Sequence, residues 1–139
     1  MSTKPDLTGL WRLDLARSKL LGPGTARMLM KIEHREPHFA QIIKAEFADG
    51  RTQLSTFRGI ADGSQFVNDL SGRQWRSHAM WQGAELVIES DVAFDTRKFH
   101  FRDHWFISGT ALVMEHRNDD LAGQIAWLEP APDIAGEFA

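Results

Sequence analysis

The sequence contains no cysteine and no tyrosine among its 139 residues. The absence of cysteine excludes a disulfide scaffold, a thiolate metal site and a cysteine nucleophile. The chain also lacks a large excess of either charge, because 16 basic and 19 acidic residues are interspersed and give a net charge of -3. Nucleic acid or an anionic membrane would require a basic surface. We therefore expect neither of them as a partner.

Long apolar runs are also missing. No run approaches the roughly 20 residues of a membrane-spanning helix, and the first residues lack the apolar region of a signal peptide. We therefore expect a cytoplasmic protein. Its length is that of a single domain, residues 1–139, with a sizeable core. Residues 130–139 contain Pro130 and Pro132 among small residues, and we expect a loose tail there unless another part of the chain pins it.

What the chain does contain is aromatic residues, with five Trp and nine Phe. Many of them stand in runs where apolar and polar residues alternate, a pattern typical of half-buried strands. The predicted strands cover residues 7–15, 27–35, 38–48, 51–58, 65–70, 73–81, 85–92, 98–107, 110–117 and 124–129.

Short turn sequences such as Glu36-Pro37 and Asp49-Gly50 join these strands, and no clear helical period interrupts them. Consecutive strands joined in this way indicate an antiparallel meander. So many strands leave no exposed edge if the sheet closes on itself. We therefore predict an all-β fold, a single antiparallel up-and-down β-barrel of about 8 to 10 strands. A two-sheet sandwich is the alternative, and the neighbour-to-neighbour turns make it the weaker one.

The longest predicted hairpin covers residues 98–117. If Ser108 and Gly109 form its two-residue loop, Asp103 and His116 lie diagonally on adjacent strands of the inner face, within reach of a direct or water-mediated hydrogen bond. An aspartate held against an imidazole raises its basicity, as a general base requires. Asp103 and His116 are therefore the candidate catalytic residues if the protein is an enzyme. The alternative is that such residues lie near the barrel mouth and are simply hydrated.

Other polar side chains are predicted among large apolar ones on the inner face, which is the composition of a ligand pocket. With Asp49-Gly50 as a loop, Arg58 lies opposite Gln41, where its guanidinium would anchor a carboxylate or carbonyl group. The alternative for Arg58 is a strand end that reaches solvent. The candidate ligand-binding residues are His34, Gln41, Arg58, Asn68, Trp75, Ser77, Trp81, Phe101, Trp105 and Met114.

The six histidines invite a metal site. His100 and His104 are four residues apart, which on a strand places them ~13 Å apart, too far to share an ion. A site would need His34 and His116 to meet across the cavity, which their spacing cannot establish. The sequence also has no nucleophile elbow and no glycine-rich phosphate loop. We therefore assign neither a metal nor a cofactor.

Gly9-Leu10-Trp11 resembles the G-x-W signature of lipocalins and related calycin barrels. Other segments are similar to bacterial lipocalin-like proteins of uncharacterised function, namely residues 7–19, 84–90, 103–105 and 114–117. The resemblance implies a barrel with a ligand cavity, and it implies no reaction. It also implies that Trp11 closes the barrel floor with a late-strand arginine, here Arg117, packed across it. The long helical lid of fatty-acid-binding barrels is missing, since only residues 16–23 separate the first two strands.

Two classes of function stay open. The first is a binding module that holds a small, largely apolar or aromatic molecule, with Arg58, Asn68 or His116 fixing its polar end. The second is a cofactor-independent barrel enzyme, a lyase, isomerase or hydratase, that uses Asp103 and His116 for proton transfer. Binding is favoured because the resemblance implies a cavity and the sequence contains no complete catalytic constellation. An interaction protein with a filled core is a weaker third alternative, and a homodimer is left open.

Overall fold

The structure is a computed structural model that describes residues 4–21, 24–118 and 121–138. It contains one antiparallel sheet of ten strands and a short 3-10 helix. The elements are β1 (Gly9–Leu13), β2 (Thr25–Arg35), β3 (His38–Phe47), β4 (Thr52–Ile60), β5 (Gln65–Leu70), β6 (Arg73–Gln82), β7 (Glu85–Phe94), β8 (Arg97–Ser108), β9 (Ala111–Asn118), β10 (Leu121–Pro130) and η1 (Pro132–Phe138).

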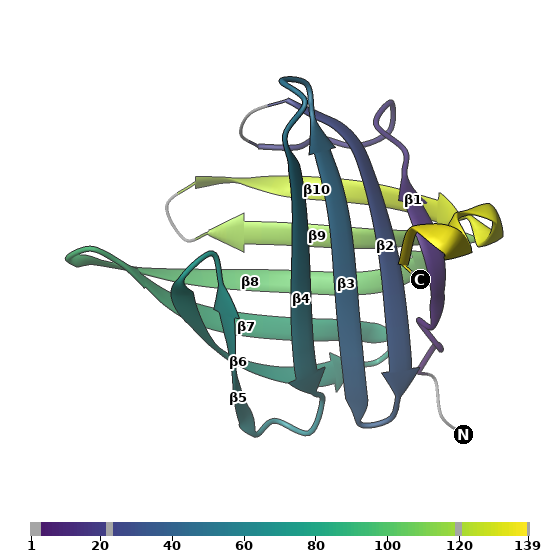
Figure 1. Cartoon of the computed structure of the whole chain (residues 1–139). Helices are drawn as coiled ribbons and strands as arrows, with labels where there is room; N and C mark the ends of the chain where they lie inside the picture. Colours follow the sequence, from purple (N-terminus) through teal and green to yellow (C-terminus); the bar gives the residue numbers. More distant parts are fainter. Residues whose placement is uncertain (1–3, 22–23, 119–120, 139) are drawn as a thin grey trace.

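The sheet curls into a nearly closed barrel, in which β1 pairs with both β2 and β10 and the two edge strands are β4 and β5. Figure 1 shows the result, with β2, β3 and β4 in front of the strands from β7 to β10 and β5 to the left of β4. The prediction of an all-β up-and-down barrel is confirmed. We call the end with the turns at residues 48–51, 71–72 and 95–96 the mouth, and the end with the turns at 36–37, 83–84 and 109–110 the floor. The described part of the chain contains no helix with the length and apolarity that crossing a membrane requires.

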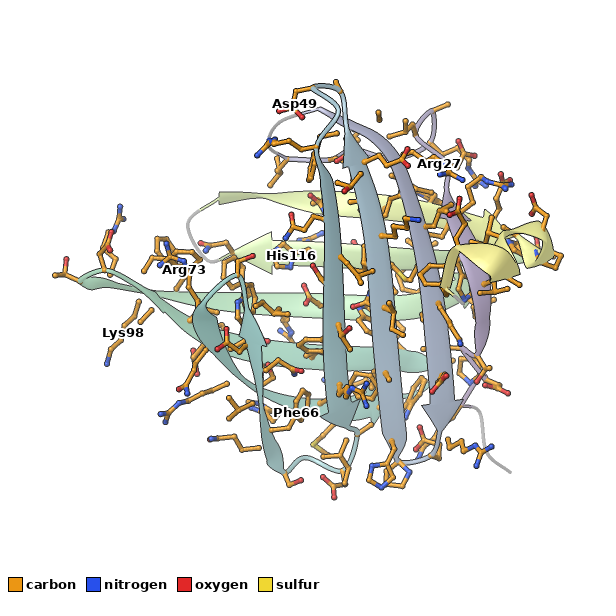
Figure 2. All side chains as sticks on the ribbon, in the orientation of Figure 1. Arg27, Asp49, Phe66, Arg73, Lys98 and His116 are labelled. Atoms are coloured by element: carbon orange, nitrogen blue, oxygen red, sulfur yellow. The ribbon has the colours of Figure 1, made fainter. Side chains whose placement is uncertain are left out.

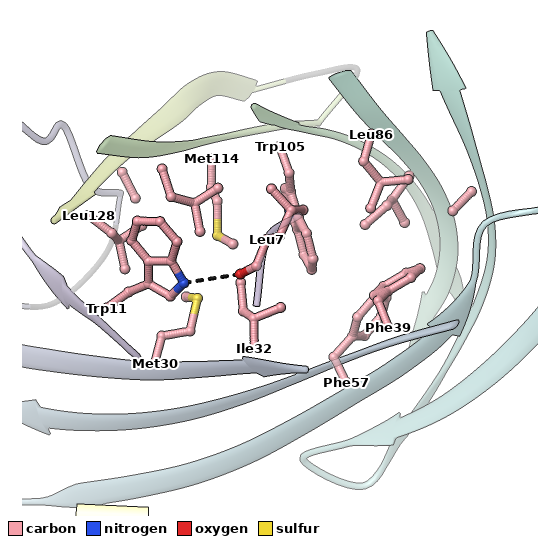
Figure 3. Packing of buried hydrophobic residues seen from close by; sticks show 14 of the residues in the cluster. Leu7, Trp11, Met30, Ile32, Phe39, Phe57, Leu86, Trp105, Met114 and Leu128 are labelled. Atoms are coloured by element: carbon pink, nitrogen blue, oxygen red, sulfur yellow. Dashed lines mark hydrogen bonds between the residues drawn. The ribbon is translucent and has the colours of Figure 1, made fainter. Parts of the chain in front are cut away.

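The barrel interior toward the floor is filled with large apolar side chains (Figure 3). Trp11 is buried there, and its indole Nε1 donates a hydrogen bond to the carbonyl oxygen of Leu7 at 3.2 Å. Arg117 lies beside Gly123 near the start of β10, whereas Trp11 pairs with Pro130 at its end. The two residues are therefore at opposite ends of β10, and the implied packing of Arg117 across Trp11 is wrong.

The register between β3 and β4 differs by one residue from the prediction. The amide of Phe47 donates to the carbonyl of Arg51 at 2.9 Å, so three residues form the loop, and Gly50 takes a φ of 90°. A type I turn followed by a glycine with positive φ is a common three-residue hairpin. Gln41 therefore pairs with Phe57 rather than with Arg58. A one-residue slip moves every side chain to the opposite face, so Arg58 lies exposed on the outer face.

Two other hairpins differ from the prediction by two residues. Their loops are Gly83-Ala84 and Gly109-Thr110, each one residue later than expected. A slip of two residues keeps each side chain on its face, because strand side chains alternate with a period of two. Asp103 and His116 therefore remain on the inner face, but they lie directly opposite one another instead of diagonally.

β4 and β5 are the two ends of the sheet, and no strand pairing joins these fully described strands. The side chain of Asn68 on β5 bridges them instead. Its Oδ1 accepts a hydrogen bond from the amide of Arg58 at 2.9 Å, and its Nδ2 donates to the carbonyl of Arg58 at 2.8 Å. The side-chain amide of Asn68 thus makes the two hydrogen bonds to the backbone of Arg58 that a paired strand would make.

The expectation of a loose tail at residues 130–139 is wrong for its described part, which ends at residue 138. β10 continues to Pro130, and η1 packs on the outside of the barrel with Ile134 buried against Leu29. The carboxylate of Glu137 accepts hydrogen bonds from Lys44 at 2.9 Å and Arg27 at 3.1 Å. Apolar burial and ion pairs to β2 and β3 together pin this segment.

Candidate functional site

A cavity of about 400 Å³ lies inside the barrel at its mouth. Its walls include three aromatic side chains on three different strands, Trp75, Phe57 and Trp105. Asp103 and His116 also line it. Figure 2 labels His116, which stands on β9. The cavity therefore combines apolar walls with a few polar groups, as ligand pockets do.

Asp103 on β8 and His116 on β9 form a direct hydrogen bond between the carboxylate and Nδ1 of the imidazole. Burial lowers the pKa of His116, but the hydrogen bond and the charge of Asp103 outweigh it, so the pKa is raised. The ring of Phe101 stacks on His116 with centroids 4.8 Å apart, and on Trp75 with centroids 5.1 Å apart. The imidazole is thus fixed in orientation, and its Nε2 is the ring nitrogen left for a further interaction.

Gln41 is the second polar group of the lower cavity and is only 7% exposed. Its side-chain Nε2 points at two methionine sulfurs, 3.4 Å from Sδ of Met30 and 3.6 Å from Sδ of Met114. The amide oxygen is therefore the atom of Gln41 that can accept a hydrogen bond in the cavity. Ser90, which also lines the cavity, shares a 2.7 Å hydrogen bond with the buried Ser77.

Several lining residues were not predicted. Ser55 and Phe57 were missed because of the one-residue slip in β4. Arg73 has the same alternation as Trp75 and Ser77, but it stands next to a turn and was not counted among the binding residues. Its guanidinium lies over the ring of Phe94 at 4.2 Å, near the β5–β6 turn (Figure 2). A glycine at the third position of the loop, Gly50, was the signal that could have identified the β4 residues.

Two predicted ligand-binding residues lie at the floor, away from this cavity. Nδ1 of His34 accepts a hydrogen bond from the amide of Leu7 at 3.1 Å, so Nε2 carries the proton that it donates to Glu36 at 2.6 Å. The indole Nε1 of Trp81 donates to the same carboxylate oxygen at 2.7 Å. His34 therefore connects the segment before β1 to the β2–β3 turn, and Trp81 connects β6 to the same turn.

The structure therefore brings together only part of the predicted set. Gln41, Trp75 and Trp105 line the cavity with Asp103 and His116. Met114 contacts Gln41, and Phe101 stacks on His116. Ser77 is hydrogen-bonded to Ser90, which also lines the cavity. Asn68 bridges β4 and β5, and Arg58 is outside.

No protein-family model and no curated protein matches the chain. Solved structures do match, 124 chains in all. Apo lipid binding protein 8 of Caenorhabditis elegans is 11% identical with a TM-score of 0.69, over 94% of this chain and 99% of its own. The REP1-NXSQ fatty acid transporter is 14% identical with a TM-score of 0.65, over 91% of this chain and 96% of its own. Human cRBP IV is 18% identical with a TM-score of 0.59, over 92% of this chain and 100% of its own.

The chain therefore has the lipocalin-like barrel fold of these structures. In this barrel the described residues between β1 and β2 form turns and one isolated bridge, from Lys19 to Ile125, and no helix. The described part of that connection therefore places no helical lid over the mouth.

Proposed function

We propose that the barrel binds a small, largely apolar or aromatic molecule in the cavity at its mouth. The observation that carries the proposal is the cavity, whose volume of about 400 Å³ falls within the usual range of ligand pockets. Trp75, Phe57 and Trp105 offer ring surfaces on which an aromatic molecule would pack. The lipid and fatty-acid names of two structural neighbours, which share this fold, also support it.

Binding of N-phenyl-1-naphthylamine, an uncharged fluorescent probe, tests the proposal. We expect its emission to rise on addition of the protein and to saturate at one probe per chain. The informative variant is Ser55→Trp, since Ser55 lines the cavity and an indole there fills much of it. We expect this change to weaken probe binding by at least tenfold, about 1.4 kcal/mol.

The matched control is Leu54→Trp, which adds the same side chain to the neighbouring residue of β4. Leu54 is 69% exposed on the outer face, so the cavity is unchanged and binding should equal that of the wild type. Equal binding by both variants would place the probe outside the cavity and contradict the proposal. Near-ultraviolet circular dichroism would establish that both variants are folded.

The direct Asp103–His116 hydrogen bond favours a second candidate, a cofactor-independent lyase, isomerase or hydratase. Asp103 would hold the imidazole, and Nε2 of His116 would transfer a proton to or from a molecule in the cavity. Turnover of a bound compound that is lost in Asp103→Asn, with binding retained, would support the enzyme. Unchanged turnover in that variant would exclude this pair as the proton-transfer group.

A further inference from the structure

The ionisable side chains that line the cavity, among the described residues, are Arg73, Asp103 and His116. Arg73 stands at the mouth, where its guanidinium covers the ring of Phe94. The other two form the hydrogen-bonded pair inside, with side chains that are 19% and 34% exposed. The interior below the mouth therefore contains one acid and one base that are already bonded to each other.

This pairing has a consequence for a charged ligand. A ligand carboxylate at the pair would place two carboxylates on one imidazolium, and in the described lining no other cation lies below Arg73. A ligand ammonium would likewise place two cations on the carboxylate of Asp103. Either arrangement leaves a charge without a full partner in a partly buried site, which is unfavourable. The inner end of the cavity is therefore matched to an uncharged group.

The hydrogen-bonding groups that remain are one donor and one acceptor. Nδ1 of His116 is bonded to the carboxylate of Asp103, which leaves Nε2 as the ring nitrogen for a ligand. The carboxylate stabilises the imidazolium, the form in which Nε2 donates. Nε2 of Gln41 faces the sulfurs of Met30 and Met114, so its Oε1 accepts. A hydroxyl or a lactam satisfies both groups, whereas an ether or a ketone satisfies only the donor.

We propose that the cavity selects a flat, uncharged aromatic molecule whose inner end both donates and accepts a hydrogen bond, as a phenol or an aromatic lactam does. Free carboxylates are excluded from that end. This inference rests on the proposed binding function and specifies its ligand class.

Competition against N-phenyl-1-naphthylamine at pH 7 tests the inference with three naphthalenes of similar size. 2-Naphthol is uncharged and both donates and accepts, 2-methoxynaphthalene only accepts, and 2-naphthoate is an anion. We expect 2-naphthol to compete at a concentration at least tenfold below that of 2-naphthoate, with 2-methoxynaphthalene between them. Competition by 2-naphthoate at the same or a lower concentration than 2-naphthol would overturn the inference. If the fluorescent probe itself fails to bind, the proposed function falls and this inference falls with it.

Asp103→Asn tests the charge argument, because it removes the carboxylate and keeps the size of the side chain. We expect the preference for 2-naphthol over 2-naphthoate to shrink by at least fivefold, because the repulsion between the two carboxylates is gone. A bound 2-naphthoate would then take the place of the Asp103 carboxylate as the anion that stabilises a protonated His116. Asp69→Asn is the matched control on the exposed face of β5, and its preference should remain that of the wild type. An unchanged preference in Asp103→Asn would overturn the charge argument.

A measurement on the wild-type protein does not depend on the folding of any variant. The imidazole proton resonances of His116 should shift on addition of 2-naphthol and should move less at the same concentration of 2-naphthoate. An unshifted His116 at saturating 2-naphthol would place the polar end elsewhere and overturn the inference.

Discussion

A β-carbon at Gly59 would lie 2.4 Å from Cζ of Phe39 and 2.6 Å from Cζ of Phe66. Both rings also pack on each other, with centroids 5.9 Å apart, so neither can move without disturbing the other. We expect Gly59→Ala to lower the free energy of unfolding by about 1–3 kcal/mol, the usual cost of overpacking. Urea denaturation would measure it. Gly136→Ala is the control, because nothing lies within 4 Å of the added carbon, and a loss as large in that variant would contradict the steric explanation.

The raised pKa of His116 predicts a pH dependence of stability. The folded protein holds this proton more tightly than the unfolded chain, whose histidine has a pKa near 6.5. The stabilisation is therefore complete below about pH 6.5 and is lost as the pH rises through the folded value. We expect nuclear magnetic resonance titration to give His116 a pKa above 6.5 in the wild type.

The control for this prediction is Asp103→Asn, which removes the partner that raises the pKa and leaves burial, which lowers it. The pKa of His116 should fall in this variant. The loss of stability as the pH rises above about 6.5 should become smaller at the same time. A wild-type value at or below 6.5 would contradict the role assigned to Asp103.

Between elements, the bridge from Asn68 to Arg58 predicts a local weakness. Asn68→Ala removes both hydrogen bonds that connect β5 to the backbone of β4, each with a net value of about 1 kcal/mol. We expect amide hydrogen exchange at Arg58 to become roughly tenfold faster, with little change in β2 and β7. Asp69→Ala, the next residue along β5, is the control. Uniform acceleration through all strands would contradict a local role.

The turns show how far the sequence determines the register. The same dipeptide, Ser-Gly, occurs at residues 71–72 and 108–109. The first forms its loop with both residues at positive φ, while at the second the loop is Gly109-Thr110 with glycine first. Both are accepted two-residue hairpin types, so the dipeptide alone cannot choose between them. Pairing of large side chains across the strands, such as Trp105 with Met114, accompanies the observed register.

Some of the predicted site residues lie in the cavity and others do not. Whether the register of their hairpin differs from the prediction by one residue or by two is one cause of this difference. The two-residue slips kept Asp103, His116 and Trp75 on the inner face, so the central pair could be predicted from alternation. The one-residue slip at Gly50 exchanged Arg58 for Phe57. Alternation also does not show how far along the barrel axis a side chain lies. His34 and Trp81 at the floor were therefore predicted together with residues at the mouth.

At the scale of the whole molecule, one apolar core joins strands that the sheet connects only weakly. In the sheet, the two halves of the chain, β1 to β4 and β5 to β10, are paired by three residues of β1 with β10. The isolated bridge from Lys19 to Ile125 and the Asn68 side chain add further backbone connections. The core crosses that division, since Phe39 on β3 packs edge-on against Trp105 on β8 with centroids 5.5 Å apart (Figure 3). The halves should therefore unfold together because of side-chain packing rather than backbone pairing.

Phe39→Ala tests this coupling. Removing a buried Phe usually costs about 3–5 kcal/mol. If side-chain packing couples the two halves, the free energy of hydrogen exchange should fall by the same amount for the slowest amides of both. These are the amides of β2 and β3, near the mutation in the sequence, and those of β7 and β8, far from it. Val67→Ala is the control, because Val67 is half exposed and truncating it should leave both groups of amides unchanged. A fall in the free energy of exchange confined to β2, β3 and β4 would show instead that each half is stabilised by its own hairpins. The two halves would then unfold separately, divided between β4 and β5 where the sheet is open.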